Sequence, residues 1–122
     1  MPKKIVYIED DLEMIYLIKM ILERKGYEIV SVSDGLKGFE TVEQEKPDLV
    51  MLDLMMPNID GWDIYHQLKS NETTNSIPVI VISAKAQPID KVLGLQIAKV
   101  NNYISKPFRP QELIDSIEEI LS

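Results

Sequence analysis

Short runs of apolar residues alternate along this chain with longer stretches in which apolar residues recur at every third or fourth position. Runs of four or five residues that are rich in β-branched side chains are typical of strands, and unbroken apolar runs are typical of strands buried on both faces. The pattern predicts five strands, at residues 4–8, 28–32, 49–52, 79–82 and 102–105. The stretches between these runs fall where helices would connect one strand to the next.

The connecting stretches carry helical spacing. The first of them has apolar residues three or four positions apart, at Met14, Leu17, Ile18 and Ile21. Gly26 follows as the expected C-terminal cap of this helix. Four more helices are predicted: a short one that carries Leu36, Phe39 and Val42, then residues 62–70, residues 89–99 and a last one that begins at Pro110. Residues 56–61, which contain proline, asparagine and glycine, are expected to form a loop.

A strand followed by a helix thus occurs five times in succession. This order is typical of an α/β fold, in which a parallel sheet is covered by helices on both faces, and right-handed crossovers restrict the possible topologies. A chain of 122 residues suits one compact domain, and we find no internal repeat, linker or low-complexity segment. We therefore expect a single domain over residues 1–122.

Composition narrows the possible function. Hydrophobic residues make up 45% of the chain, which argues against disorder, and a net charge of -7 argues against a surface that contacts nucleic-acid phosphates. There is no cysteine and one histidine, His66, so disulfides, thiolate catalysis and cysteine- or multi-histidine metal sites are excluded. No apolar run has the form of a signal peptide or the length of a membrane span. We expect a soluble cytoplasmic protein whose partners are neither membranes nor nucleic acid.

Polar residues stand where the predicted strands end. Ligands of open parallel sheets bind beyond the carboxyl ends of the strands, so these positions are candidates for a site. The residues in question are Glu9 and Asp10 after the first strand, Asp53 after the third, Ser83 after the fourth and Lys106 after the fifth. Three carboxylates, a hydroxyl and an ammonium group are therefore expected to converge on one edge of the sheet.

This set of groups fits phosphoryl chemistry. Clustered carboxylates repel one another unless a cation is present, and Mg²⁺ prefers one or two carboxylates together with waters and phosphate oxygens. A carboxylate such as Asp53 can act as a nucleophile toward phosphorus. Mg²⁺ and Lys106 would neutralise charge on the transferring oxygens, and the Ser83 hydroxyl could donate a hydrogen bond to one of them.

Four motifs in this order resemble the response-regulator receiver family of two-component signalling, over essentially the whole chain. They are the run from Ile8 to Asp11, the segment from Asp53 to Gly61, the pair Ser83-Ala84 and the triplet Lys106-Pro107-Phe108. Each motif alone is weak, whereas all four at predicted strand ends form a specific signal. The resemblance implies a flavodoxin-like doubly wound sheet with strand order 2-1-3-4-5 and five helices. It also implies a signalling receiver that catalyses only its own phosphorylation and dephosphorylation.

The resemblance also assigns roles to residues. Asp53 is implied as the phosphoacceptor and Lys106 as the group that binds the phosphoryl oxygens, with a cis bond to Pro107. Mg²⁺ would contact Asp10, Asp53 and the backbone carbonyl of Met55, and Glu9 would reach it mainly through water. The implied phosphodonor is a histidine kinase or a phosphotransfer protein.

Two surfaces are implied as well. Ser83 would be the switch hydroxyl and Tyr103 the switch aromatic, and together they would shift the face formed by the fourth helix, fifth strand and fifth helix toward a downstream protein target or an output domain. The first helix would dock on the kinase. Its apolar contacts would be Met14 and Leu17, although core packing explains these two residues equally well.

Some positions depart from the commonest family pattern. Glu9 replaces an aspartate, and the stretch 84–103 is one residue longer than usual. Ala98-Lys99-Val100 stands where Ala-Gly-Ala is typical, so the end of the fourth helix is expected to differ from the family. Asn101-Asn102 replaces a frequent acidic pair, and asparagine can take the left-handed backbone that a cap requires. Arg109 stands where the last helix usually has an Asp, Ser or Thr cap, so this end is expected to be capped differently.

Other functions remain open on the sequence. One is a Mg²⁺-dependent phosphatase with an aspartate nucleophile, of the haloacid dehalogenase type, but Met55 stands where such enzymes carry their acid-base aspartate. Another is a phosphorylation-independent interaction module of the same fold. A third is a flavin or nucleotide binder, but no glycine-rich phosphate loop follows the first strand. Asp10 and Asp11, taken alone, fit helix-capping acids as well as they fit ligands.

Overall fold

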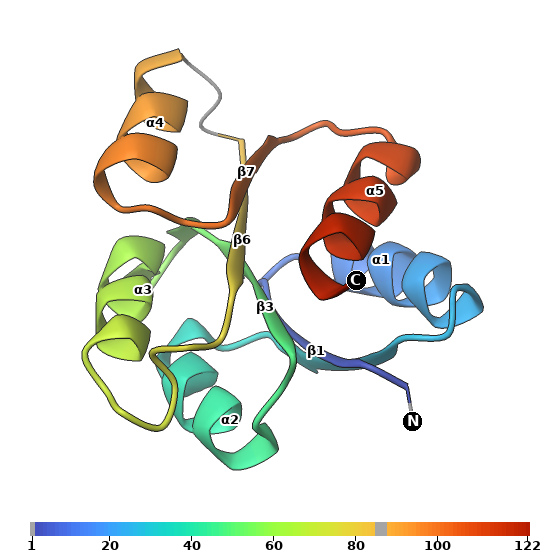
Figure 1. Ribbon diagram of the computed structural model, residues 1–122, viewed down its shortest axis with the longest axis horizontal. Helices are drawn as coiled ribbons and strands as arrows, with labels where there is room; N and C mark the ends of the chain where they lie inside the picture. Colours follow the sequence, from blue (N-terminus) through green and yellow to red (C-terminus); the bar gives the residue numbers. More distant parts are fainter. Residues whose placement is uncertain (1, 85–87) are drawn as a thin grey trace.

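The computed structural model describes residues 2–84 and 88–122 of the chain (Figure 1). Five strands form one parallel sheet in the order β2-β1-β3-β6-β7. The strands are β1 (Lys4–Ile8), β2 (Glu28–Val32), β3 (Leu49–Asp53), β6 (Val79–Ser83) and β7 (Asn102–Ser105). Counted within this sheet, the order is 2-1-3-4-5, so the predicted doubly wound sheet is confirmed.

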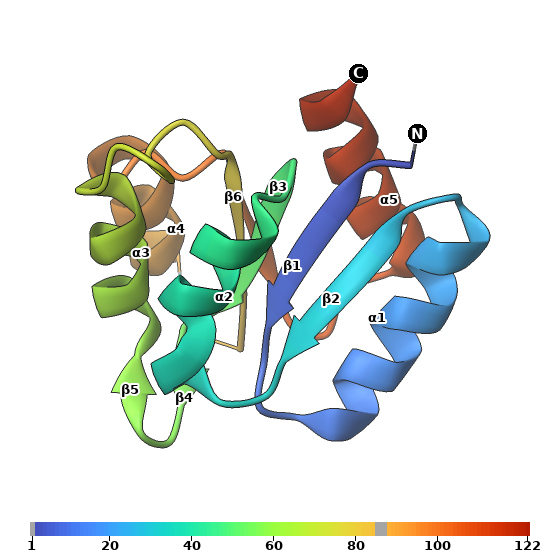
Figure 2. The same ribbon diagram turned by 90° about the horizontal axis from the view of Figure 1, so that it is seen from below.

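Helices cover both faces of the sheet, as Figure 1 and Figure 2 show. One face carries α1 (Leu12–Arg24) and α5 (Pro110–Leu121). The opposite face carries α2 (Gly38–Glu45), α3 (Gly61–Lys69) and α4 (Pro88–Val92). The predicted three-layer arrangement of helix, sheet and helix is therefore present.

Alternate side chains of the central strands build the two halves of the core. Ile5 and Tyr7 of β1 pack in the half beneath α1 and α5, whereas Val6 and Ile8 pack in the half beneath α2 and α3. All four side chains are completely buried. Because successive strand side chains point to opposite faces, the residue that follows β1, Glu9, continues on the side of Tyr7. This alternation decides which side chains can reach the site.

The segment predicted as a loop at 56–61 contains a short antiparallel ribbon. Its strands are β4 (Met55–Met56) and β5 (Ile59–Asp60), joined by the two residues Pro57 and Asn58. A two-residue connection between short extended pieces is the commonest hairpin geometry. The expectation of an irregular loop is therefore wrong in detail, and the ribbon leads directly into α3.

Gly61 begins α3 because nothing larger fits there. A Cβ atom at this position would lie 2.5 Å from the Leu54 Cα and 2.6 Å from the Asp53 carbonyl oxygen. The Asp60 side chain caps the helix by accepting a hydrogen bond from the Trp62 amide at 2.8 Å. The start of α3 is thus pressed against the end of β3, next to Asp53.

The second predicted helix begins later than its apolar pattern indicated. A 3₁₀ turn, η1 (Gly35–Lys37), precedes α2, and the Asp34 side chain caps it by accepting from the Leu36 amide at 3.0 Å. Leu36 is 64% exposed, so it does not belong to the buried face that Val42 forms. The Asp34-Gly35 turn explains the difference, because it delays the regular helix by one turn.

The fourth predicted helix, expected at 89–99, is not a regular α-helix to its end. It continues from α4 into a π-helical turn, η2 (Leu93–Ile97), in which the Ala98 amide donates to the Leu93 carbonyl at 2.8 Å. A π turn closes over one residue more than an α turn. The stretch 84–103 is one residue longer than is usual in the family. The π turn can accommodate that additional residue.

The left-handed residue after η2 is Lys99, with φ 62°, and neither asparagine takes this conformation. The asparagines instead tie the segment to its neighbours. The Asn101 side chain accepts from the Val79 amide at 3.0 Å, and the Asn102 side chain donates to Ser116 Oγ at 2.7 Å. These two hydrogen bonds hold the connection against β6 and α5.

The end of α1 and the start of α5 agree with the sequence. Gly26, with φ 92°, follows the end of α1, and its amide donates to the Glu23 carbonyl at 3.1 Å. Arg109 precedes α5 without a side-chain capping bond, and Pro110 occupies the first turn. Gly26 and Pro110 thus stand where the sequence predicted, after the end of α1 and at the start of α5.

Candidate functional site

Two buried carboxylates lie side by side at the carboxyl ends of β1 and β3. Glu9 is completely buried and Asp53 is 3% exposed. The apolar runs of β1 and β3 are paired in parallel, with Tyr7 opposite Met51 and Ile8 opposite Leu52. This register brings Glu9 and Asp53 to the same edge of the sheet, as the sequence predicted. Unpaired charges at such depth would be strongly destabilising.

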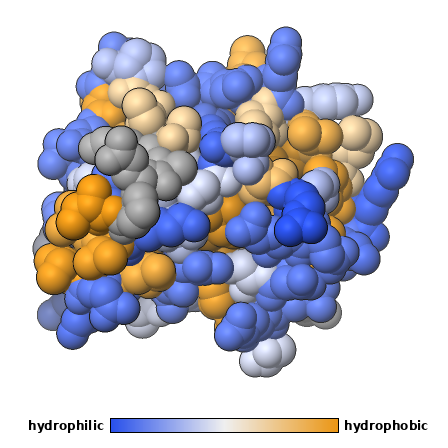
Figure 3. Space-filling model, turned by 90° about the horizontal axis from the view of Figure 1, so that it is seen from above, coloured by the Kyte–Doolittle hydropathy of each residue, from blue (hydrophilic) through white to orange (hydrophobic). Residues whose placement is uncertain are grey.

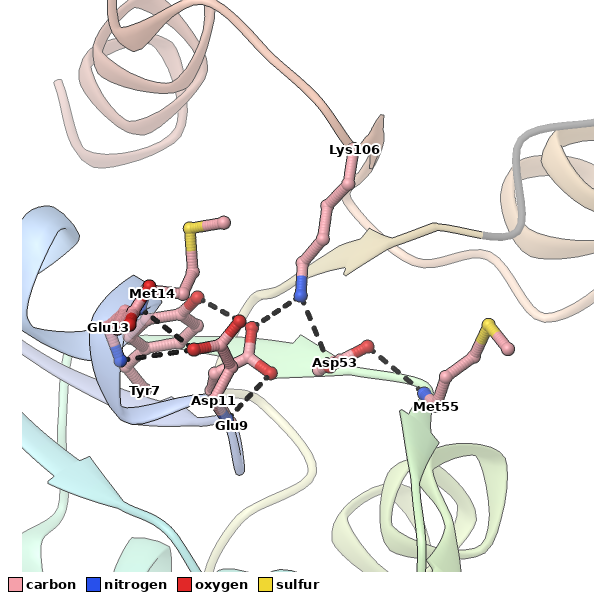
Figure 4. Close-up of polar contacts among 8 residues, drawn as sticks. All are labelled: Tyr7, Glu9, Asp11, Glu13, Met14, Asp53, Met55 and Lys106. Atoms are coloured by element: carbon pink, nitrogen blue, oxygen red, sulfur yellow. Dashed lines mark hydrogen bonds and ion pairs between the residues drawn. The ribbon is translucent and has the colours of Figure 1, made fainter.

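Lys106 supplies the compensating positive charge. Its Nζ lies 2.6 Å from Glu9 Oε1 and 3.3 Å from Asp53 Oδ2. Figure 4 draws both contacts. Lys106 follows β7, and its peptide bond to Pro107 is cis, as expected. Burial alone would lower the pKa of Lys106, but the hydrogen bond and charge of Glu9, together with Asp53, outweigh it and raise the pKa. The side chain is therefore an ammonium ion at neutral pH.

Glu9 experiences the opposite balance. Burial raises the pKa of its carboxyl, the nearby Asp53 raises it further, and Lys106 opposes the rise. Two carboxylates that share one ammonium ion remain short of positive charge. The pocket therefore favours a further cation.

Tyr7 makes a contact that the sequence analysis missed. Its hydroxyl donates to Glu9 Oε1 at 2.9 Å, and burial together with Glu9 raises the pKa of this phenol. The available signal was a tyrosine in an otherwise aliphatic strand, two residues before Glu9. Residues two apart in a strand share a face.

The other carboxylate oxygen of Asp53 is held by the main chain. Asp53 Oδ1 accepts from the Met55 amide at 3.0 Å, while Oδ2 contacts Lys106. The Met55 side chain is 55% exposed, so this residue meets the site through its backbone. Both Asp53 oxygens are thus oriented by donors on neighbouring elements.

Asp10 and Asp11 have different surroundings. Asp11 caps α1, because its Oδ1 accepts from the amides of Glu13 and Met14 at 3.0 Å and 3.2 Å. Asp10 instead joins Glu9 and Asp53 in a group whose carboxylate oxygens lie within 4.8 Å of one another. The capping interpretation therefore holds for Asp11, and Asp10 belongs to the carboxylate group.

The oxygens of this group fit a hard divalent cation. Carboxylate oxygens are the ligands that Mg²⁺ prefers, and the converging negative charge would be relieved by it. Glu9 and Asp53 approach from strand ends, and Asp10 from the connection to α1. Soft metals are disfavoured, because neither thiolate nor imidazole is among these ligands.

Ser83 and Tyr103 lie together on neighbouring strands. Ser83 ends β6 and is completely buried, and Tyr103 of β7 is 4% exposed. Burial raises the pKa of Tyr103, and a hydrogen bond with the Ser83 side chain acts against this rise. The structure thus brings the two residues that the resemblance implied as a switch into contact, with the tyrosine ring already buried.

The two α1 residues implied in docking differ in exposure. Met14 is half-buried and packs against the core half beneath α1 and α5, whereas Leu17 is 46% exposed. Core packing therefore accounts for much of Met14, and Leu17 offers the more accessible apolar contact.

Comparisons with known proteins agree with this geometry. The family model of the response regulator receiver domain matches residues 5–118. The chain belongs to the response regulator receiver family. The receiver carries the alternation of strands and helices, the buried acids and the lysine described above.

Similar proteins include full-length regulators. The chain is 37% identical over 121 residues to the alkaline phosphatase synthesis transcriptional regulatory protein PhoP of Bacillus subtilis and 36% identical to the DNA-binding dual master transcriptional regulator RpaA of Synechocystis. Each match covers 99% of this chain and 49% of the relative. The chain thus spans about half the length of these relatives.

Solved receiver domains have the same fold. A CheY-like receiver domain protein from Methanospirillum hungatei superimposes with a TM-score of 0.88 at 26% identity, covering 99% of this chain and 94% of the other. The BeF3-activated N-terminal receiver domain of RstA from Klebsiella pneumoniae superimposes with a TM-score of 0.87 at 30% identity, covering 97% of each chain.

Within residues 2–84 and 88–122, no helix combines the length and apolar character that crossing a bilayer requires.

Proposed function

We propose that this receiver accepts a phosphoryl group on Asp53 in the cytoplasm and passes the signal on by a change in its surface. The observation that carries the proposal is the position of Asp53, which lies beside Lys106 and within a carboxylate group of cation-binding size. A phosphoacceptor needs positive charge nearby, and Asp53 has Lys106 beside it. The phosphodonor is a histidine kinase or a phosphotransfer protein.

Mg²⁺ would be held by Asp10, Asp53 and the backbone carbonyl of Met55, with Glu9 acting mainly through water. When bound, this cation supplies positive charge that stabilises the oxygens of the transferring phosphoryl group. The excess of carboxylate over ammonium in the pocket supports this assignment. The family match and the acidic group support the choice of cation.

Asp53 and Lys106 have different roles in the proposed transfer. One carboxylate oxygen of Asp53 attacks phosphorus, the bond from phosphorus to the donor's histidine nitrogen breaks, and that nitrogen keeps the electron pair. Lys106, which already lies 3.3 Å from Asp53, then pairs with a phosphoryl oxygen. The receiver thus promotes its own phosphorylation and the later hydrolysis of the acyl phosphate, rather than turnover of an external substrate.

Ser83 and Tyr103 would transmit the change. The Ser83 hydroxyl moves to donate to a phosphoryl oxygen and gives up its contact with Tyr103, which leaves the ring to settle into the vacated space. The face of α4, β7 and α5 then shifts its population toward the active form. In a Ser83→Ala variant that is phosphorylated normally, this face should lose most of its change in amide chemical shifts. A full change there would contradict the role of Ser83.

The partners of the proposed switch are a kinase on one side and a protein target or output domain on the other. Leu17, exposed on α1, is the proposed apolar contact for the kinase, with Met14 behind it. The named relatives are transcriptional regulators about twice as long as this chain, which supports an output domain as one form of the downstream partner.

The test of the acceptor is Asp53→Asn. With acetyl phosphate or a phosphorylated kinase and Mg²⁺, the unmodified chain should gain 80 Da by intact-mass spectrometry, and the variant should gain nothing. The matched control is Asp60→Asn, which changes an exposed capping aspartate near the site. Phosphate uptake by Asp53→Asn would overturn the proposal. Sustained hydrolysis of p-nitrophenyl phosphate by the unmodified chain would instead favour the phosphatase alternative.

A further inference from the structure

Tyr7 is a completely buried tyrosine at the edge of the proposed phosphoryl site. Its ring packs in the core half beneath α1 and α5, and its hydroxyl donates to Glu9 Oε1 at 2.9 Å (Figure 4). The ring could be replaced by phenylalanine without loss of core volume. The hydroxyl therefore has its effect on Glu9 and not on packing.

The two oxygens of Glu9 are held unequally. Oε1 accepts from Tyr7 at 2.9 Å and from Lys106 at 2.6 Å, whereas Oε2 has a 3.5 Å contact with the Asp11 amide, at the limit of a hydrogen bond. One oxygen thus anchors the carboxylate. The other oxygen is held only weakly and keeps acceptor capacity.

Lys106 is shared between Glu9 and Asp53, and phosphorylation of Asp53 would change how its donors are divided. A phosphoryl group on Asp53 adds negative charge and three strong acceptor oxygens next to Nζ, so the lysine is drawn toward it. Glu9 Oε1 then loses its shortest donor in a site where an unsatisfied charged acceptor is costly. The Tyr7 hydroxyl is the donor that can remain.

We propose that Tyr7 is a positioning residue of the phosphoryl site, whose hydroxyl fixes Glu9 Oε1 so that Oε2 serves the cation while Lys106 transfers to the phosphoryl group. This inference rests on the proposed function of Asp53. Glu9 stands where an aspartate is commoner in the family, and its additional methylene group lets the carboxylate reach Tyr7. The tyrosine and the glutamate therefore act as a pair.

The test is a double-mutant cycle read out by Mg²⁺ affinity without any phosphodonor. Isothermal titration calorimetry of Tyr7→Phe should show Mg²⁺ binding about tenfold weaker than in the unmodified chain, the scale typical of a group that orients a metal ligand. In the Glu9→Asp background, Tyr7→Phe should change the affinity less than twofold, because the shorter side chain does not reach the hydroxyl.

The matched control is Tyr65→Phe, which removes another buried tyrosine hydroxyl, one that donates to the Ala98 carbonyl at 2.7 Å. It should leave Mg²⁺ affinity unchanged. Equal weakening by Tyr7→Phe in both backgrounds, or no weakening in either, would overturn the inference. If the unmodified chain binds no Mg²⁺ at millimolar concentration, the proposed function itself fails and the inference falls with it.

A second measurement needs no variant. A crystal structure of the unmodified chain with Mg²⁺ and beryllium fluoride should retain a hydrogen bond between Tyr7 and Glu9 Oε1, while Lys106 lies closer to the fluoride than to Glu9. If Tyr7 has left Glu9 in that structure, the positioning role is wrong even though beryllium fluoride on Asp53 would still support the proposed acceptor.

Discussion

The carboxylate pocket at the edge of the sheet and the α4–η2 segment (88–97), which covers part of one face, are built in opposite ways. In the pocket, Glu9 and Asp53 are buried and each carboxylate is held by more than one donor. Along α4–η2, apolar side chains lie in the open: Ile89, Val92, Leu93, Leu95 and Ile97 are between 36% and 71% exposed. Figure 3 shows apolar side chains gathered over this segment.

This difference fits the two roles proposed for these regions: phosphoryl chemistry in the pocket and a change of surface at α4–η2. Under the proposed function, the pocket orients a nucleophile and a lysine. Such a site needs side chains fixed by several partners, and burial supplies that rigidity. The proposed output surface would change its population, which needs a small free-energy gap between its arrangements. A π turn, the left-handed Lys99 and exposed apolar side chains favour a small gap. We expect substitutions in the pocket to have large effects on stability and those in α4–η2 to have small ones.

Lys106→Ala should give the largest effect. Removing the ammonium leaves Glu9 and Asp53 buried without their counter-charge, and breaking such a pair costs about 3 kcal/mol of unfolding free energy at pH 7. The raised pKa of Glu9 means that protonation favours the folded state, so the deficit should shrink as pH falls toward the ordinary pKa of a glutamate carboxyl. Urea denaturation at pH 7.5 and pH 5 measures both values.

The matched control for this experiment is Lys4→Ala, which removes a lysine paired with Glu45 at 3.1 Å on the partly exposed rim. Its loss should be below about 1 kcal/mol and nearly independent of pH in this range. A deficit in Lys106→Ala that grows on acidification would contradict the charge balance described for the pocket.

Gly61→Ala should come next. The added Cβ would meet the Leu54 Cα and the Asp53 carbonyl oxygen, both main-chain atoms that cannot turn away. We expect a loss of about 2 kcal/mol in thermal unfolding, the scale of overpacking in a filled core. Gly26→Ala is the contrasting control. Its Cβ would meet nothing within 4 Å, so only the cost of φ 92° remains, about 1 kcal/mol. A smaller loss for Gly61 than for Gly26 would show that the start of α3 is not tightly packed.

Lys99→Gly should raise stability rather than lower it. A left-handed backbone at φ 62° disfavours a residue with a Cβ by roughly 1 kcal/mol, and glycine removes that cost. The gain in unfolding free energy should therefore be about 0.5–1 kcal/mol. Lys46→Gly, at φ 47° after α2, is a control of the same kind far from the proposed switch. If Lys99→Gly destabilises the chain, the lysine side chain has a role that outweighs its backbone strain.

Ile97→Ser should have the smallest effect on folding. The side chain is 71% exposed, and surface substitutions of this kind change stability by about 0.5 kcal/mol or less. Its effect should instead be weaker binding of the downstream partner that contacts the α4–η2 face. The affinity of that partner is measured for the variant and for the unmodified chain, each with and without phosphorylation. A loss above about 2 kcal/mol would mean that this face is packed like the pocket, and the contrast between the two regions would disappear.

The sequence predicted the pocket better than it predicted the α4–η2 segment, and physical reasons explain this. The apolar runs that end at Asp53 and Ser83 allow little choice, because a strand buried on both faces must place its first polar residue at the sheet edge. Leu93 and Ile97 have the spacing of an α-helix, yet a π turn forms there. Their exposed side chains do not enforce the register that burial would enforce.

The sequence alone was enough to establish the order of the five sheet strands and five helices, the family, and the set of acids, serine and lysine at the strand ends. The spacing of hydrophobic residues and the positions of turn residues depend on residues that are close in the sequence. Such patterns can therefore be recognised without the structure. Only the tertiary structure decided that Asp11 caps a helix while Asp10 joins the carboxylate group, that Lys99 takes the left-handed turn, and that Tyr7 holds Glu9. Each of these depends on where side chains meet in space, which local pattern leaves open.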